Sequence, residues 1–202
     1  MAIKKTEAFV LKSFNWSESS RTISFFTRDE GKLALTDRGG RSLSSKRGRA
    51  LPFASLALTY YSSERSSNGY LSEVSVKEAW PIEGEGALGR LAFGSAAREL
   101  LWLVLPDEEP HPDIYDYTLK FFTLLSAVER ESLPALFLAY FLRLLSMLGY
   151  QPVLSGCVGC GKALERMQTA RLSFSADRGG LVCGACQAAG ESYIGFSLED
   201  LT

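Results

Sequence analysis

Residues 157–186 read CVGCGKALERMQTARLSFSADRGGLVCGAC and hold every cysteine of the 202-residue chain. Cys157 and Cys160 form one Cys-x-x-Cys pair, and Cys183 and Cys186 form the second. Two such thiolate pairs are a frequent ligand set of tetrahedral zinc sites. The sequence therefore predicts that the four cysteines bind one Zn2+ ion within a small module over residues 156–190.

We expect this metal to be structural, because four cysteine ligands leave no open position for water or substrate. Two disulfides are an alternative. The start of the chain, Met1-Ala-Ile-Lys-Lys, leads into an alternating segment and does not resemble a secretory signal, so stable disulfides are not expected. A thioredoxin-like redox pair is disfavoured, because neither cysteine pair follows the strand-to-helix pattern of that motif.

Length and composition indicate one large or two small globular domains, with 46% hydrophobic residues. No apolar run reaches the roughly 18 residues of a membrane span, because Arg98, Lys120 and Arg143 interrupt the longest candidates. The single histidine, His111, lies between two prolines in an expected loop, which gives a hydrolytic triad little support. We expect a cytoplasmic protein with no membrane partner.

The first 80 residues carry the pattern of short strands. Apolar and β-branched residues mark strands at residues 7–12, 21–27, 33–36, 54–61 and 70–79, and turn residues separate them. Five short strands with no long helix indicate a small closed barrel over residues 1–80. Periodicity alone leaves an OB barrel and an SH3-like barrel both open.

The remainder is expected to be helical up to the cysteine module. Helical patterns cover residues 87–105, 113–128 and 134–148, which places a helical domain at residues 81–155. Between the cysteine pairs, residues 171–175 and 180–182 predict a hairpin. Residues 191–202 resemble the start of a capped helix that is cut short. The fold class is therefore α+β: a small β-barrel, a helical bundle and a zinc ribbon-like module.

Positive charge is concentrated in the first part of the chain. Residues 1–80 hold 13 Lys and Arg against 8 Asp and Glu, a net charge of +5, whereas residues 81–202 hold 9 against 15, a net charge of −6. A flexible Gly/Ser-rich stretch from residue 38 to residue 49 contains five cations and no acid. Such a stretch suits phosphate contacts without sequence preference. The candidate DNA-binding residues are Arg38, Arg41, Lys46, Arg47 and Arg49. A solvated loop is the alternative.

Aromatic residues in the barrel region could add base stacking, although most are expected to lie in the core. These candidates are Phe14, Trp16, Phe25, Tyr60, Tyr61 and Tyr70. A G-x-G-x-x-G spacing at residues 84–89 is discounted as a dinucleotide site, because it does not follow a strand of a βαβ unit. Four acidic residues lie close together in the sequence: Asp107, Glu108, Glu109 and Asp113. We interpret them as a solvated acidic face and not as a catalytic acid/base pair.

Taken in order, these segments resemble the bacterial RecO family of recombination mediators. The resemblance is carried by residues 7–12, 17–21, 27–32, 38–41, 46–53, 71–74 and 148–152, and by the two cysteine pairs with Phe174-Ser175 and Gly179-Gly180 between them. It covers nearly the whole chain.

The resemblance implies an OB fold, a helical domain and a zinc-binding module. It implies a protein without catalytic residues that binds single- and double-stranded DNA and anneals complementary strands. With RecR, such a protein helps to load RecA onto DNA coated by single-stranded-DNA-binding protein (SSB), and it would be nucleoid-associated. It also implies that the helical domain docks the acidic SSB tail, for which Arg98, Lys120 and Arg143 are the candidate cations. RecO proteins usually continue with further helices after the second cysteine pair.

A protein-interaction adaptor that binds SSB and RecR, with incidental DNA contact, is the alternative function. A metal-dependent nuclease is a third, and it is disfavoured because the sequence offers no convincing carboxylate cluster.

Overall fold

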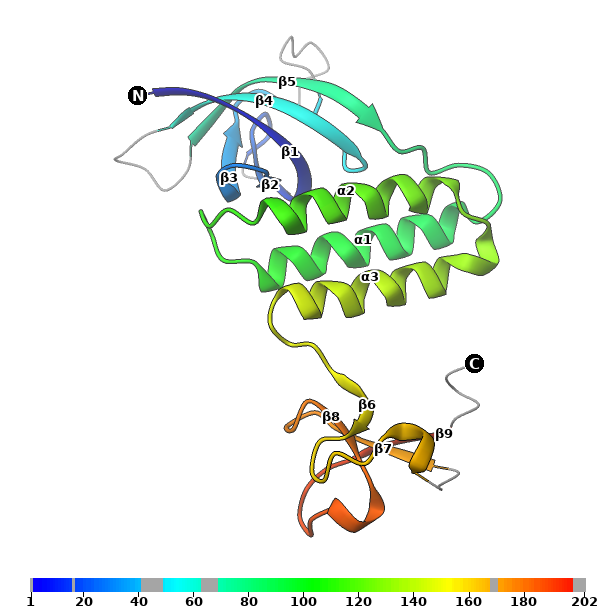
Figure 1. Cartoon of the computed structure of the whole chain (residues 1–202). Helices are drawn as coiled ribbons and strands as arrows, with labels where there is room; N and C mark the ends of the chain where they lie inside the picture. The colour runs from blue at the N-terminus through cyan, green and yellow to red at the C-terminus, as the bar shows by residue number, and fades with distance from the viewer. Residues whose placement is uncertain (1, 16, 41–48, 63–68, 168–170, 198–202) are drawn as a thin grey trace. The chain divides into compact units, whose positions relative to one another are not determined.

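The computed structural model describes residues 2–15, 17–40, 49–62, 69–167 and 171–197. The chain forms two compact units, Met1–Tyr140 and Phe141–Thr202. The first unit holds a barrel and most of the helical segment, and the second holds a small sheet (Figure 1). The predicted α+β fold class is confirmed.

Five strands close into the predicted barrel. They are β1 (Ala2–Asn15), β2 (Arg21–Thr27), β3 (Gly31–Asp37), β4 (Ala54–Ser62) and β5 (Gly69–Ala79). Their order around the barrel is β1-β2-β3-β5-β4, and β1 also pairs with β4. The β3–β5 pair is parallel, whereas the other pairs are antiparallel. This order is that of an OB fold, so the structure resolves the choice of barrel that the sequence left open.

The barrel strands bury apolar side chains on two sides. Alternate residues such as Val10 and Phe25 point into the barrel, where they join the core cluster. Their neighbours Phe9 and Phe26 are also fully buried, and their rings pack edge-on with centroids 5.5 Å apart. Phe9 in turn stacks on Tyr115 of the helical segment at 5.4 Å. This double burial explains why β1 and β2 carry continuous apolar runs instead of strict alternation.

Three helices follow: α1 (Ala87–Val104), α2 (Pro112–Ala127) and α3 (Leu133–Met147), with a 3-10 turn at Arg130–Ser132. Their bounds agree with the predicted helices to within two residues. α1 ends just before Pro106, and α2 begins with Pro112 in its first turn, where proline costs no hydrogen bond. α2 lies beside the barrel (Figure 1), and its aromatic side chains supply the contacts with Phe9 and Trp80.

The loop between α1 and α2 packs against the start of β3. The backbone N–H of Glu108 donates to the carbonyl of Lys32 at 3.0 Å, and the Lys32 ammonium lies 3.3 Å from Asp107. Gly31 has a φ of 72°, and any side chain there would collide with the backbone of Glu109. The acidic loop is therefore held against the barrel.

The second unit contains a four-stranded sheet of order β6-β8-β7-β9. Its strands are β6 (Val153–Cys157), β7 (Arg171–Ser175), β8 (Gly180–Val182) and β9 (Ile194–Ser197), with 3-10 turns at Leu164–Arg166 and Gly184–Cys186. The predicted hairpin at β7 and β8 is confirmed. The sheet extends beyond the predicted module on both sides, because β6 begins at Val153 and β9 ends at Ser197.

The expectation of a helix within residues 191–202 is wrong for Ile194–Ser197, which pair with β7 as a strand. Residues 198–202, on which the rest of that expectation falls, lie outside the described residues. Within the described part of the chain, none of the helices has both the length and the apolar character needed to cross a membrane.

Candidate metal centre and nucleic-acid interface

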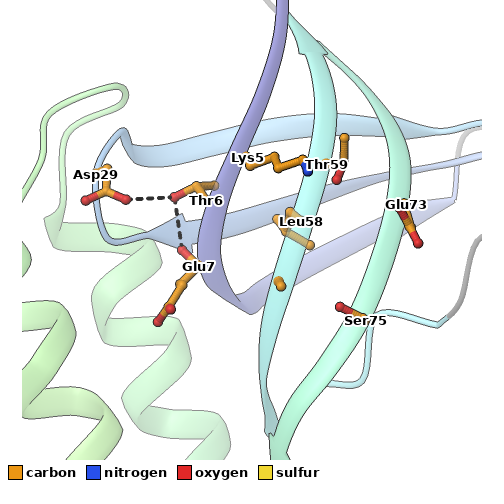
Figure 2. Close-up of a pocket in the computed structure, with 9 residues that line it drawn as sticks. Lys5, Thr6, Glu7, Asp29, Leu58, Thr59, Glu73 and Ser75 are labelled. Atoms are coloured by element: carbon orange, nitrogen blue, oxygen red, sulfur yellow. Dashed lines mark hydrogen bonds between the residues drawn. The ribbon is translucent and has the colours of Figure 1, made fainter.

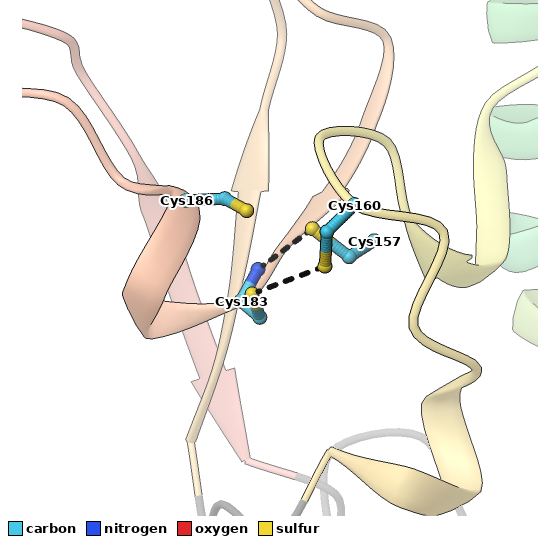
Figure 3. A group of neighbouring side chains, drawn as sticks. All are labelled: Cys157, Cys160, Cys183 and Cys186. Carbon is cyan, nitrogen blue, oxygen red and sulfur yellow. Dashed lines mark hydrogen bonds between the residues drawn. The ribbon is translucent and has the colours of Figure 1, made fainter.

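The four cysteines converge as the spacing predicts. Their Sγ atoms all lie within 4.8 Å of one another, and the Sγ atoms of Cys160 and Cys183 are 3.7 Å apart (Figure 3). A tetrahedron with Zn–S bonds of about 2.3 Å has S–S edges of about 3.8 Å. Four cysteines at this spacing could hold a metal ion.

Backbone groups favour the thiolate form of Cys157. Its Sγ accepts hydrogen bonds from the N–H groups of Gly159 at 3.4 Å and Cys183 at 3.3 Å. Burial raises the pKa of Cys157, but backbone hydrogen bonds from Cys183, Cys160 and Gly159 and the Cys183 side chain outweigh it and bring the pKa to about 6. Side-chain hydrogen bonds with Cys183 and Cys160 raise the pKa of Cys186 to about 12. Cys157 therefore loses its proton more easily than Cys186. A bound cation would supply the positive charge that stabilises the other cysteines as thiolates.

Gly159 leaves the space that the second cysteine pair occupies. A Cβ at residue 159 would lie 2.9 Å from Cys186 Cβ and 3.0 Å from its Sγ. Gly184, in the other pair, has no neighbour within 4 Å of such a Cβ. The close approach of the two cysteine pairs therefore depends on the missing side chain at residue 159.

The basic segment is described only at its ends. Arg38 and Arg49 are exposed, whereas Arg41, Lys46 and Arg47 lie outside the described residues. The Arg38 guanidinium lies over the ring of Tyr70, 4.0 Å from its centroid. This cation–π contact fixes a cation of the segment on the barrel surface.

Tyr70 belongs to a row of outward-facing side chains across three strands. Ile3 on β1 lies opposite Tyr61 on β4, and Tyr61 lies opposite Tyr70 on β5. Directly opposite residues share one face of a sheet, and here their neighbours Tyr60 and Leu71 point into the core. Ile3 is 63% exposed and Tyr61 is 37% exposed. We call Ile3, Tyr61, Tyr70 and Arg38 the tyrosine row.

The other aromatic candidates occupy different positions. Phe25 and Tyr60 are buried in the barrel core, as expected for most of the set. Phe14 is 44% exposed and packs near Trp102, and the Lys12 ammonium lies 4.0 Å from the Trp102 ring centroid. Trp16 lies outside the described residues. Tyr61 and Tyr70 are thus the two candidates that meet on one face.

A hollow of about 450 Å³ lies further along the same strands, lined by Lys5, Thr6, Glu7, Asp29, Ala57, Leu58, Thr59, Glu73 and Ser75 (Figure 2). Its lining contains three carboxylates and one ammonium group. Glu7 is paired with Lys77, and the Thr6 hydroxyl donates to Asp29 at 3.5 Å. This acidic lining disfavours binding of a phosphate backbone within the hollow itself.

The three candidate cations for an acidic tail have different surroundings. Arg98 donates to the carbonyls of Val10 at 2.7 Å and Leu11 at 2.9 Å, and burial lowers its pKa. This guanidinium ties α1 to β1 and is only partly exposed. Lys120 on α2 and Arg143 on α3 are exposed.

Sequence reasoning missed the pairing of Arg28 with Asp116. The Arg28 guanidinium donates two hydrogen bonds of 3.0 Å to the Asp116 carboxylate, joining the end of β2 to α2. The hydrogen bond from Arg28 lowers the pKa of Asp116, and the same bond raises the pKa of Arg28. The two residues are 88 positions apart, so no local pattern could have indicated the pair.

Two protein-family models match this chain, one over its N-terminal part and one over its C-terminal part. The model of the recombination protein O N terminal matches residues 1–80, and the model of the recombination protein O C terminal matches residues 86–198. The chain belongs to the RecO family.

Among the RecO proteins that it resembles, the DNA repair protein RecO of Desulfitobacterium hafniense is 32% identical over 193 residues, covering 95% of this chain and 67% of that protein. The corresponding protein of Symbiobacterium thermophilum is 31% identical over 201 residues, covering 100% of this chain and 78% of that protein. The RecO of Caldanaerobacter subterraneus subsp. tengcongensis is 34% identical over 188 residues, with 92% and 72% covered. The resemblance seen in the sequence is therefore confirmed.

Proposed function

We propose that this protein is a non-enzymatic DNA-binding mediator of recombinational repair. It binds single- and double-stranded DNA, anneals complementary strands and, with RecR, helps to load RecA onto SSB-coated single strands. The observation that carries the proposal is the tyrosine row, where Arg38 lies over Tyr70 and Tyr70 lies opposite Tyr61. Membership of the RecO family supports it.

The chemistry of this surface suits unpaired strands. Aromatic faces stack on any base, and each such contact contributes roughly 1–3 kcal/mol. The cations Arg38, Arg41, Lys46, Arg47 and Arg49 neutralise phosphates and release counterions. When two complementary strands are bound, this neutralisation lowers the repulsion between their backbones, and annealing becomes faster.

We propose that the ion held by Cys157, Cys160, Cys183 and Cys186 is a structural Zn2+. The closely spaced thiolate set supports zinc, and four protein ligands leave no position for a reacting water. Its role is to hold the two cysteine pairs together.

For the acidic SSB tail, we propose Lys120 and Arg143 as contacts and withdraw Arg98, whose donors are used within the fold. Titration of the full chain with a tail peptide tests this proposal. Lys120→Glu and Arg143→Glu are each expected to weaken peptide binding. Wild-type affinity for the peptide in both variants would contradict the proposal.

The central experiment is fluorescence-monitored annealing of complementary oligonucleotides across a salt series, with and without SSB. The wild type is expected to accelerate annealing, and each phosphate contact should add roughly 0.7 to the slope of log affinity against log salt for single strands. Charge reversal of Arg38, Arg41, Lys46, Arg47 and Arg49 together should abolish acceleration and flatten the slope. Charge reversal of Lys162 and Arg166, exposed in the second unit, is the control. Unchanged annealing in the fivefold variant would refute the proposal.

A protein-interaction adaptor remains the second candidate, because α1 exposes large apolar side chains: Leu88 is 80% exposed and Leu103 is 64% exposed. Leu88 lies one helical turn from Leu91, which is 44% exposed, and adjoining apolar side chains of this kind favour contact with another protein. An adaptor would keep its affinity for RecR and the SSB tail, and its effect on RecA loading, in the fivefold charge-reversal variant. A mediator of the proposed kind would lose the loading effect.

A further inference from the structure

Main-chain hydrogen bonds hold both cysteine pairs, and side chains add further contacts after the second pair. The first pair is fixed by the main chain: Cys157 N–H donates to the Lys162 carbonyl, Gly161 N–H donates to the Cys157 carbonyl, and both distances are 2.8 Å. Val158 N–H also donates to the Leu181 carbonyl at 2.8 Å. In the second pair, Cys186 N–H donates to the Cys183 carbonyl at 2.8 Å and closes the 3-10 turn Gly184–Cys186, but no strand follows until Ile194.

Side chains hold the chain after the second pair. Arg178, in the turn between β7 and β8, donates from one guanidinium nitrogen to the Cys186 carbonyl at 3.2 Å. Its other terminal nitrogen lies 2.6 Å from Glu191 Oε1. Glu191 Oε2 accepts from the Tyr193 hydroxyl at 2.7 Å, and that hydroxyl accepts from the Ala188 N–H at 2.7 Å. Gln187 adds a bond of 2.7 Å to the Ser173 hydroxyl.

One of these contacts reaches the backbone of a candidate metal ligand. The carbonyl that Arg178 contacts belongs to Cys186 itself, and the ion pair with Glu191 fixes the direction of the guanidinium. Because a guanidinium donates along fixed, divergent directions, it can bridge a carbonyl and a carboxylate at once, which a lysine ammonium on a flexible stem does less well. We infer that Arg178 is a positioning residue for the metal centre, which holds Cys186 against the other three thiolates and slows metal loss.

The inference rests on the proposed zinc occupancy, and its test separates the two. The full chain is loaded with Zn2+, its bound zinc is measured, and release is followed with an excess of the chromogenic chelator 4-(2-pyridylazo)resorcinol. Removing a residue that orients a metal ligand typically costs 10- to 100-fold in metal affinity. Arg178→Gln is expected to release zinc roughly 10- to 100-fold faster than the wild type. Glu191→Gln, which keeps the side-chain size, is expected to release zinc at an intermediate rate.

The control and the spectroscopic readout distinguish positioning from loss of charge or of fold. Arg166→Gln removes one exposed cation from the same sheet unit and should release zinc like the wild type. With Co2+ in place of zinc, Arg178→Gln should show a weaker thiolate-to-metal charge-transfer band, because Cys186 is no longer held in place. Arg178→Lys should not restore the wild-type rate.

Wild-type zinc retention in both Arg178→Gln and Glu191→Gln would overturn the positioning role while leaving the zinc site intact. A wild-type chain that binds no zinc would overturn both. If Arg178→Gln does not fold, the Glu191→Gln variant tests the positioning role by itself. Faster zinc release than in the wild type supports the role, and the wild-type rate overturns it.

Discussion

Single residues determine how closely the cysteine pairs approach each other. Gly159→Ala would place a methyl group 2.9 Å from Cys186 Cβ, whereas Gly184→Ala would add a methyl group in open space. We therefore expect Gly159→Ala to weaken zinc binding by at least tenfold and Gly184→Ala to leave it near the wild-type value. Competition titration with a chelator measures both affinities. Equal affinities in the two variants would show that the pairs can separate without loss of the metal.

The tyrosine row is also a residue-scale hypothesis, because two rings on adjacent strands are each expected to stack on a base. Tyr61→Ala and Tyr70→Ala should each weaken binding of a single-stranded oligonucleotide by roughly 1–3 kcal/mol. Fluorescence anisotropy measures this loss, and duplex affinity should fall less because paired bases are not available to stack. Tyr150→Ala, at a tyrosine that is 74% exposed in the second unit, is the control. A uniform loss for single strands and duplexes would point to lost charge contacts instead.

At the scale of elements, Arg98 connects α1 to β1. Arg98→Met keeps most of the side-chain volume but leaves the carbonyls of Val10 and Leu11 without these donors. An unsatisfied buried acceptor costs about 1–3 kcal/mol, so we expect a loss of that order in the free energy of unfolding. Urea unfolding measures it. Lys120→Met, at an exposed position on α2, should have little effect. If the two variants are equally stable, Arg98 is not the link proposed here.

The pair of Arg28 and Asp116 predicts a pH-dependent link between β2 and α2. The hydrogen bond from Arg28 lowers the pKa of Asp116 in the folded state. This stabilisation is therefore present above the unfolded pKa of about 4, and it is lost as the pH falls through the folded pKa. Both side chains are about half-exposed, so solvent screens the interaction and the stabilisation is small.

Asp116→Asn should accordingly be less stable than the wild type at pH 7, and the difference should shrink at pH 2–3. Urea unfolding at both pH values measures this change, and Glu99→Gln, at an exposed position on α1, is the control. A difference that stays constant with pH would mean that the amide disturbs packing instead of removing a charge.

The local sequence pattern predicted the strands and helices that have clear hydrophobic periodicity. It missed β6 and β9, which do not have it. The barrel strands and the three helices show clear periodicity and clear end signals such as Pro106 and Pro112. β6 and β9 are short, and Val153, Leu154 and Ile194 on them are at least 40% exposed. These strands form because they pair with β8 and β7, which is a long-range effect that a local pattern does not contain.

At the scale of the whole molecule, the chain divides into two units, and we expect only the second to depend on a bound metal. The second unit has a small core of Cys157, Met167, Leu172, Leu181 and Val182, whereas the barrel has its own larger core. If the four cysteines hold the proposed zinc, the metal contributes directly to folding, and chelation should unfold the second unit before the first.

Hydrogen exchange with and without EDTA measures this difference. Amides of β7 and β8 should lose protection, while amides of β2 and β4 keep it, and affinity for DNA should persist. Loss of protection in both units at the same rate would contradict this order of unfolding.

The sequence identified the residues of the candidate metal centre more completely than those of the candidate DNA-binding surface. Cysteine spacing alone identified all four candidate ligands, because the chemistry of the metal imposes that spacing. The sequence also named Tyr61 and Tyr70, but it could not separate them from the buried Phe25 and Tyr60, since strand register decides which side each ring faces. Arg98 appeared to be a surface cation because sequence does not show that two backbone carbonyls face it.

The double burial of β1 and β2 limits how the barrel can evolve. Phe9 and Phe26 lie on the outer face of the barrel, and both rings contact Tyr115 of α2. A substitution that changes the volume of one of these rings therefore requires a compensating change in the others. The family boundary between residues 80 and 86 divides the sequence, but it does not divide a physical unit. Barrel and helices are therefore expected to be inherited together, and a barrel exchanged between distant relatives would bring mismatched rings to this contact.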